Sequence, residues 1–213
     1  MPSDAAPLKP QRIVALFLAF ALAVVGAAAG LNAIVKKHKT IAYLQSQVAP
    51  LGIKLDINTN QITTPGAVLT AGLIILALVS FLDLALLLLP SHHVIPSSTR
   101  FLGLTTLLLA FSTVWIFASL VPVTVIAAHG QAKVAAYVHG ISLPDAVIKS
   151  TEGKLGFSRN YWTEYFIRLF VIAPWVSLVF GAIATLVSFI AWRRSKAIAA
   201  ASSDTDSVDM GEK

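Results

Sequence analysis

The chain contains no cysteine, and this absence excludes several classes of protein. Disulfide-stapled scaffolds, thiolate enzymes, Cys-ligated zinc sites, iron–sulfur centres and palmitoylated anchors all require a thiol. The sequence also lacks an Asn-x-Ser/Thr sequon, so N-glycosylation cannot mark an outward-facing loop.

Charge is scarce as well. Charged residues make up 12% of the 213 residues and hydrophobic residues 56%, whereas a soluble domain carries about 25% charged residues. The chain is therefore predicted to be a membrane protein. The net charge of +6 is informative only through the positions of the basic residues relative to the apolar segments.

Four long apolar runs predict four transmembrane helices. A bilayer core of about 30 Å needs roughly 20 helical residues, and unpaired backbone is not tolerated in lipid. Thr63-Thr64-Pro65 opens the second run and Pro90 closes it, while Pro122 and Pro174 lie within the third and fourth runs and predict kinks. The predicted spans are about 13–35, 66–89, 101–128 and 165–192.

The predicted fold class is therefore all-α, an integral membrane bundle of four helices with short loop helices. It comprises a cytosolic segment 1–12, a transmembrane domain 13–196 and a disordered polar tail 197–213. In the first long loop, Ile41 to Val48 could extend the first helix, and Ile53 to Ile57 alternates as a strand would. In the second long loop, Ser142 and Pro144 could open a short helix.

The first run also permits a different interpretation. Lys9 and Arg12 precede an apolar core that leads to Ala27-Ala28-Ala29, which resembles the cleavage site of a signal peptide. The apolar stretch continues to Val35, longer than a signal core usually is, and this favours an uncleaved anchor.

The basic residues give only a weak prediction of orientation. With four spans the two termini share a side, and the basic residues divide almost evenly between the two sides. The cluster Arg193-Arg194-Ser195-Lys196 favours cytosolic termini, and Lys36-Lys37-His38-Lys39 favours the opposite orientation. The prediction adopted is that both termini are cytosolic, in a plasma membrane or an endomembrane.

Asp83 is the one acidic residue inside an apolar run, which makes it the first candidate for a functional residue. The short turn between the second and third spans forms a helical hairpin, so Thr105 and Thr106 should lie near the depth of Asp83, with Arg100 within reach. These four residues are predicted to form an intramembrane polar clamp. The alternative is a proton or cation site in a small transporter or channel subunit, although no second ionisable group is apparent on a facing helix. Arg168, at the other membrane surface, is expected to extend to the lipid headgroups, with Glu164 a better placed partner than Asp83.

Small residues predict where helices approach each other closely. Gly26 and Gly30 form a GxxxG motif in the first span, which should pack against another helix of the bundle or against a second copy. Ser177, Gly181 and Thr185 form a second small-residue stripe that could be its mate.

Four spans, two long loops on one side and a basic stop before a polar tail resemble the organisation of MARVEL-type and Sur7/claudin-type membrane proteins. The likeness covers residues 11–196 and is one of topology. This chain lacks the Gly-Leu-Trp and paired-cysteine signature of the claudin-like families. The resemblance implies a role in membrane organisation, trafficking or cell-surface domains.

The expected function is non-enzymatic: membrane organisation, or service as an accessory subunit, through helix packing. No nucleophile–base pair, metal cluster or phosphate-binding loop suggests an enzyme, a cofactor or a metal site. The expected partners are the lipid bilayer and a second copy or another membrane protein, with no nucleic acid.

Overall fold

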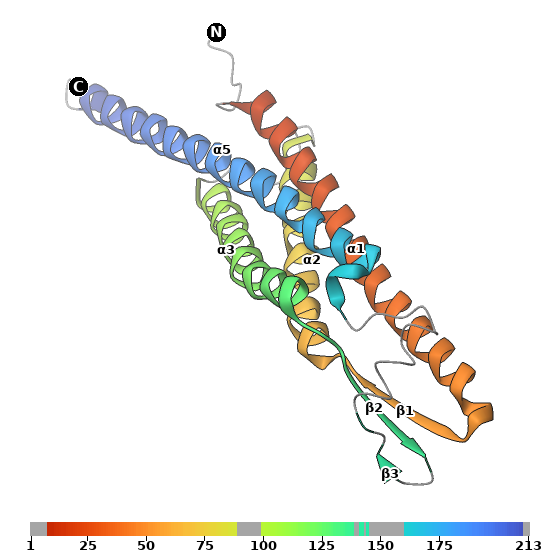
Figure 1. Ribbon diagram of the computed structural model, residues 1–213. Helices are drawn as coiled ribbons and strands as arrows, with labels where there is room; N and C mark the ends of the chain where they lie inside the picture. The colour runs from red at the N-terminus through yellow and green to blue at the C-terminus, as the bar shows by residue number, and fades with distance from the viewer. Residues whose placement is uncertain (1–7, 89–98, 139–140, 143, 145–159, 211–213) are drawn as a thin grey trace.

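Four long helices form the body of the computed structural model, which describes residues 8–88, 99–138, 141–142, 144 and 160–210. They are α1 (Lys9–Val48), α2 (Asn60–Leu88), α3 (Thr99–His129) and α5 (Tyr165–Met210), shown in Figure 1. All four are long and apolar enough to cross a membrane, which confirms the predicted four-helix architecture.

The helices pack as a four-cornered bundle. α1 lies against α2 and α5, and α3 lies against the same two helices, whereas the diagonal pair α2 and α5 meets only narrowly. The interior is filled mainly by leucine and other branched side chains, including Leu16, Leu73, Leu109 and Leu120, which are fully buried. Large apolar side chains such as Leu78, Leu107 and Leu186 face outward, as expected where the surrounding solvent is lipid.

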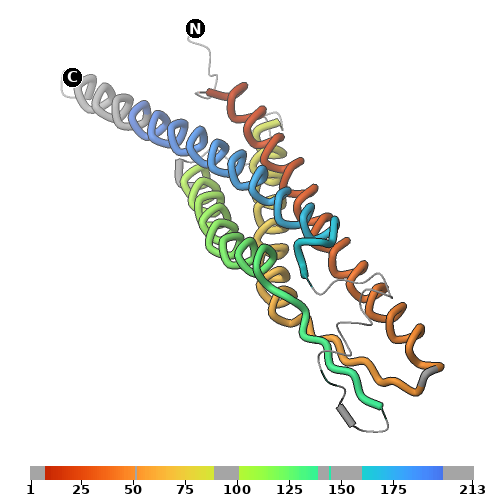
Figure 2. The backbone as a smooth tube through the Cα atoms, viewed as in Figure 1, coloured from red at the N-terminus to blue at the C-terminus, as the bar shows by residue number. Residues whose placement is uncertain are grey.

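A three-stranded antiparallel sheet lies at the end of the bundle away from the chain termini (Figure 1). Its strands are β1 (Ile53–Asn58), β2 (Lys133–Val138) and β3 (Ile141–Ser142), in the order β1-β2-β3. β1 pairs with β2 over its whole length, from Ile53 opposite Val138 to Asn58 opposite Lys133. Figure 2 shows these two segments, far apart in sequence, running side by side.

The segment that leads from α1 into β1 agrees with the prediction. α1 continues past the apolar run to Val48, and the 3₁₀ turn η1 (Ala49–Leu51) leads to Gly52, whose φ of 68° reverses the chain. A left-handed backbone of this kind favours glycine because it has no Cβ. The predicted helix extension and the predicted strand are both confirmed, whereas the partner strands β2 and β3 were not predicted.

Three predicted details are wrong. α2 begins at Asn60, five residues before Pro65, because Asn58 Oδ1 and the Thr59 carbonyl accept the first backbone N–H groups. Residues 197–210 continue α5 as helix rather than forming a disordered tail, consistent with the high helix propensity of the alanines there. Ser142 belongs to β3 and Pro144 to no helix, and the remaining residues of the predicted loop helix, like Pro90, lie outside the described residues.

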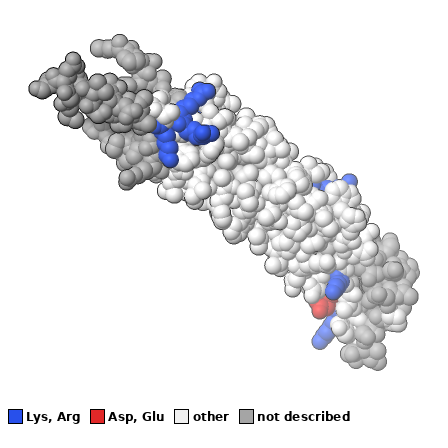
Figure 3. Space-filling model, turned by 90° about the vertical axis from the view of Figure 1, so that its left-hand side faces the viewer, with Lys and Arg blue, Asp and Glu red and all other residues white. Residues whose placement is uncertain are grey.

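Charged residues are concentrated toward the two ends. Figure 3 shows an uncharged belt with basic side chains on either side of it on the face in view. Lys9, Arg193, Arg194 and Lys196 belong to the end that carries the termini, and Lys36, Lys39, Lys54 and Lys133 to the end that carries the sheet. This distribution agrees with a belt of lipid contact between two polar surfaces.

Candidate functional site

Asp83 is buried in the bundle, and its partner is Arg12 in the first turns of α1. Arg12 Nη2 donates to Asp83 Oδ1 at 3.2 Å and to Oδ2 at 3.1 Å. Each of the two residues is only 4% exposed. The ion pair therefore joins α1 to α2, and both carboxylate oxygens are occupied by the same cation.

The predicted partners of Asp83 need correction. Thr105 and Thr106 are buried, but both hydroxyls donate to the Leu102 carbonyl of their own helix. The side chain of Arg100 lies outside the described residues. The prediction that no second ionisable group faces Asp83 is also wrong, because Arg12 was assigned to the cytosolic flank of the first span and instead lies inside α1.

A signal in the sequence could have identified Arg12. Residues Arg12, Leu16, Ala19, Ala23, Gly26 and Gly30 are buried and recur every three or four positions along α1. This spacing places them on one face of a helix. Extending the GxxxG face by four turns toward the N-terminus therefore reaches Arg12.

The same argument applies to α2, where Gly66, Leu69, Leu73, Leu76, Ser80 and Asp83 make up one buried stripe. Since both stripes are buried where α1 packs against α2, the two charged residues face each other near the end that carries the termini.

Two polar atoms near the ion pair lack hydrogen-bond partners in the described part of the chain. They are Arg12 Nε and the hydroxyl of Ser80, one turn before Asp83 on the same buried stripe. A buried polar group without a partner is destabilising by about 1–3 kcal/mol. The bundle interior therefore does not supply every hydrogen bond that the groups around the ion pair could make.

The GxxxG face packs within the same chain. A Cβ atom built on Gly26 would lie 3.1 Å from Ser177 Oγ and 3.2 Å from Leu73 Cδ1. A Cβ atom on Gly30 would collide with Thr70 Oγ1 and lie 3.2 Å from Phe170 Cε2. The two glycines therefore allow α2 and α5 to approach α1, and the internal packing alternative is confirmed.

The second small-residue stripe is the mate of this face only at Ser177. Its hydroxyl is 2.7 Å from the Leu22 carbonyl of α1 and 3.1 Å from the Ala173 carbonyl, and it can donate to either. Further along α5, Gly181 lies against Leu76 and Thr113, and the Thr185 hydroxyl is 3.3 Å from that of Thr113. Gly181 and Thr185 therefore pack toward α2 and α3 rather than α1.

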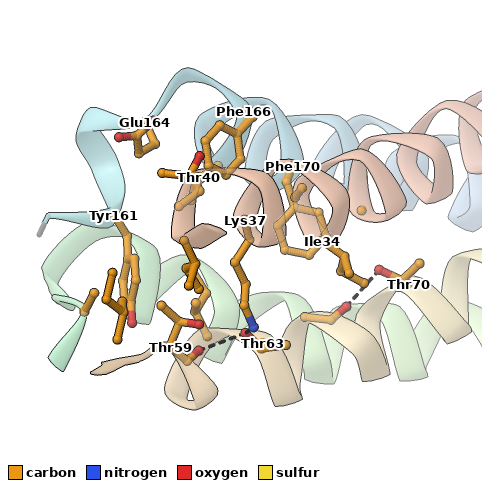
Figure 4. Close-up of a pocket in the computed structure, with 18 of the residues that line it drawn as sticks. Ile34, Lys37, Thr40, Thr59, Thr63, Thr70, Tyr161, Glu164, Phe166 and Phe170 are labelled. Carbon is orange, nitrogen blue, oxygen red and sulfur yellow. Dashed lines mark hydrogen bonds between the residues drawn. The ribbon is translucent and has the colours of Figure 1, made fainter. Parts of the chain in front are cut away.

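A cavity of about 100 Å³ lies near the sheet end, between α1, α2, α5 and the 3₁₀ turn η2 (Tyr161–Thr163). Apolar side chains such as Ile34, Phe166 and Phe170 line much of it, and Lys37 and Tyr161 also belong to its wall. Figure 4 shows the Lys37 side chain extending to Thr63 on α2, where Nζ donates to Oγ1 at 3.0 Å. Sequence reasoning missed this cavity because four separate segments form it.

Arg168, in the first turn of α5, forms no ion pair with Glu164, the partner that the sequence favoured over Asp83. Its Nη2 donates to the Thr163 carbonyl at 3.4 Å, and the one ion pair among the described residues is that of Arg12 with Asp83. Within the same residues no group of three histidine or acidic side chains is placed to hold a metal ion. His92 and His93 lie outside the described part of the chain.

Comparison with known proteins adds no relative. No protein-family model, no curated protein and no solved structure matches this chain. Functional inference therefore depends on the ion pair, the helix contacts and the cavity.

Proposed function

We propose that this chain is a non-enzymatic multi-pass membrane protein that acts through a fixed four-helix bundle, in membrane organisation or as an accessory subunit of a larger membrane assembly. The observation that carries the proposal is the buried ion pair of Arg12 with Asp83. Because this ion pair joins α1 to α2, it acts as a clamp between the two helices.

The geometry of the pair favours a clamp over a transport site. A carboxylate that binds a cation during transport must exchange partners, and Asp83 already shares both oxygens with a guanidinium. The charge of arginine is permanent under physiological conditions, so the competitor cannot be removed by proton loss. The Asp83 carboxylate is therefore occupied by Arg12 and is not free to bind a transported cation.

Lateral association would use a surface other than the GxxxG face, because that face is buried inside the bundle. The outward surfaces of the four helices carry large apolar side chains, including Phe17, Phe111 and Phe189. These surfaces contact lipid or another membrane protein. The topological resemblance to MARVEL-type and claudin-type proteins supports the same class of role.

The test compares stability with ion flux in one set of variants. We expect Asp83→Asn to lower the free energy of unfolding by about 3 kcal/mol or more, because Arg12 would remain buried without a counter-ion. The intrinsic fluorescence of the four tryptophans reports unfolding in detergent. Asp56→Asn, the same chemical change on an exposed strand position, is the matched control and should leave the unfolding midpoint unchanged.

A double variant tests whether the contact between α1 and α2, rather than the two charges themselves, stabilises the bundle. Replacing both partners, Arg12→Met with Asp83→Leu, should recover much of the stability that Asp83→Asn loses, since apolar pairs can substitute for buried ion pairs. In proteoliposomes, wild type and both variants should conduct protons and potassium no faster than empty vesicles. Wild-type flux that Asp83→Asn abolishes at an unchanged unfolding midpoint would instead establish a transporter.

A further inference from the structure

The cavity near the sheet end has an apolar wall built from three helices. Ile34 of α1 and Phe166 and Phe170 of α5 line it, and Ile62 and Gly66 of α2 complete that side. A Cβ atom on Gly66 would lie 3.2 Å from the Phe170 ring, so the glycine leaves room for that ring beside α2. A wall of this composition suits a hydrocarbon chain.

One cation belongs to the wall. Lys37 is half-buried and lies two residues beyond the apolar run of α1, which places it near the membrane surface. Its Nζ donates to Thr63 Oγ1, and the Thr63 hydroxyl donates in turn to the Thr59 carbonyl. An ammonium group has three N–H donors, and no carboxylate of the described residues forms an ion pair with this one. N–H donors of Lys37 therefore remain available for hydrogen bonds to an anion.

A buried hydroxyl without a hydrogen-bond partner belongs to the same wall. Tyr161 is 4% exposed, and its hydroxyl has no partner among the described groups. Figure 4 shows the ring standing in the cavity with its hydroxyl directed toward the α2 side, where Thr59 and Thr63 lie. Burial raises the pKa of this hydroxyl above its usual value of 10.0, so it stays protonated and can donate a hydrogen bond. A bound acceptor would satisfy it.

The charge near the cavity is positive on balance. Besides Lys37, Lys36 places its Nζ 5.9 Å from the centre of the Phe166 ring, which lines the cavity. Glu164 also lines it and carries the opposing charge. In Figure 4 the Glu164 side chain lies apart from Lys37, on the far side of Thr40. Two cations against one carboxylate favour an anionic ligand head.

We propose that this cavity binds an amphiphile with a carboxylate or phosphate head and a hydrocarbon chain. The head accepts hydrogen bonds from Lys37 and Tyr161, and the chain lies against Ile34, Phe166 and Phe170. This site is independent of the Arg12–Asp83 clamp, which lies toward the other end of the bundle.

The test uses the full chain in a nonionic detergent and three photoactivatable probes that share one acyl chain. The probes end in a carboxylate, a phosphate or a neutral alcohol. We expect saturable labelling by one or both anionic probes, mapped by mass spectrometry to peptides that line the cavity, and at least tenfold weaker labelling by the alcohol. Preference between the carboxylate and the phosphate identifies the source as a free fatty acid or a phosphate-headed lipid.

Variants with matched controls assign the head-group contacts. Lys37→Met should weaken anionic labelling about tenfold and Tyr161→Phe several-fold. Lys39→Met and Tyr165→Phe change the same residue types outside the cavity wall and should leave labelling within twofold of wild type. Ile34→Trp should fill the cavity and so block labelling, although every polar group of the wall is retained. Tryptophan-detected unfolding without the probe verifies that each variant is folded.

Three results would overturn the proposal: equal labelling by the alcohol and the anionic probes, labelling unaffected by Lys37→Met and Ile34→Trp in folded protein, or an absence of saturable labelling. Binding of inorganic phosphate alone, without any binding of the acylated probes, would also overturn it, because it would show an anion site with no role for the apolar wall.

Discussion

At the scale of single residues, Arg12 and Asp83 illustrate how a bundle in lipid holds charge. Either residue alone would bury an ion without a counter-ion, which costs several kcal/mol. Placed on facing stripes of α1 and α2, they satisfy each other through two hydrogen bonds to one guanidinium nitrogen. The charge of each residue is visible in the sequence, but the choice of partner depends on which helix faces which.

Gly30 should be intolerant of any larger side chain. Gly30→Leu would place atoms where Thr70 and Phe170 already lie, and we expect it to lower the free energy of unfolding by about 1–3 kcal/mol. Ala28→Leu adds a similar volume on an exposed position of the same helix and should have little effect. Equal unfolding midpoints for the two variants in detergent would contradict this packing arrangement.

The buried hydroxyl of Tyr161 should lose its proton at a higher pH than an exposed tyrosine does. Because burial raises its pKa above 10.0, the phenolate absorbance that Tyr161→Phe removes should appear only above that pH. In the unfolded chain the same group ionises near pH 10. The stability that the raised pKa reflects is therefore present below about pH 10 and lost as the pH rises toward the folded-state value. Tyr165→Phe, at a position 72% exposed, is the control; absorbance lost below pH 10 in Tyr161→Phe would contradict the prediction.

At the scale of secondary-structure elements, apolar runs and their periodicity predicted the four helices well. The apolar composition of each run determines its helix, because lipid requires every backbone group in a span to be paired within its own helix. Their exact ends were less predictable, since Asn58, Thr59 and a series of alanines moved the start of α2 and the end of α5. β2 was missed because Lys133 to Val138 has no clear alternation and becomes a strand by pairing with β1.

The pairing of β1 with β2 can be tested cleanly because the chain has no cysteine of its own. Leu55 and Ala136 are opposite each other in the register, so Leu55→Cys with Ala136→Cys should form a disulfide under mild oxidation. Mass spectrometry of the blocked protein measures the fraction that is crosslinked. Lys54→Cys with Ala136→Cys places the first thiol on the other face of β1 and should crosslink far less. Equal crosslinking of the two pairs would contradict the register.

At the scale of the whole molecule, the sequence predicted the class of protein and the number of spans but not the contents of the site. It identified Asp83 and the Gly26–Gly30 face, each from residues within one run. The partner Arg12 and the cavity near Tyr161 arise from contacts among α1, α2, α5 and η2. Such contacts depend on the mutual rotation of the helices, which no single run encodes.

Both termini should lie on one side of the membrane and the sheet on the other. Epitope tags at the two ends should show the same accessibility in sealed cells, and a tag inserted between residues 143 and 159 should show the opposite accessibility. Cytosolic termini remain the prediction for the absolute orientation, which follows from the cluster Arg193 to Lys196. Opposite accessibility of the two ends would indicate an odd number of spans.

The pairing of β1 with β2 also imposes an order on biosynthesis. β1 lies between α1 and α2 in the chain and β2 follows α3, so β1 is synthesised two helices before its partner. Until its partner is made, β1 presents an unpaired strand edge, the kind of surface that recruits other chains. Pairing with β2 covers one edge of β1, while its other edge stays at the rim of the sheet. A chaperone bound to the edge of β1 that pairs with β2 would therefore be displaced only once β2 has been synthesised.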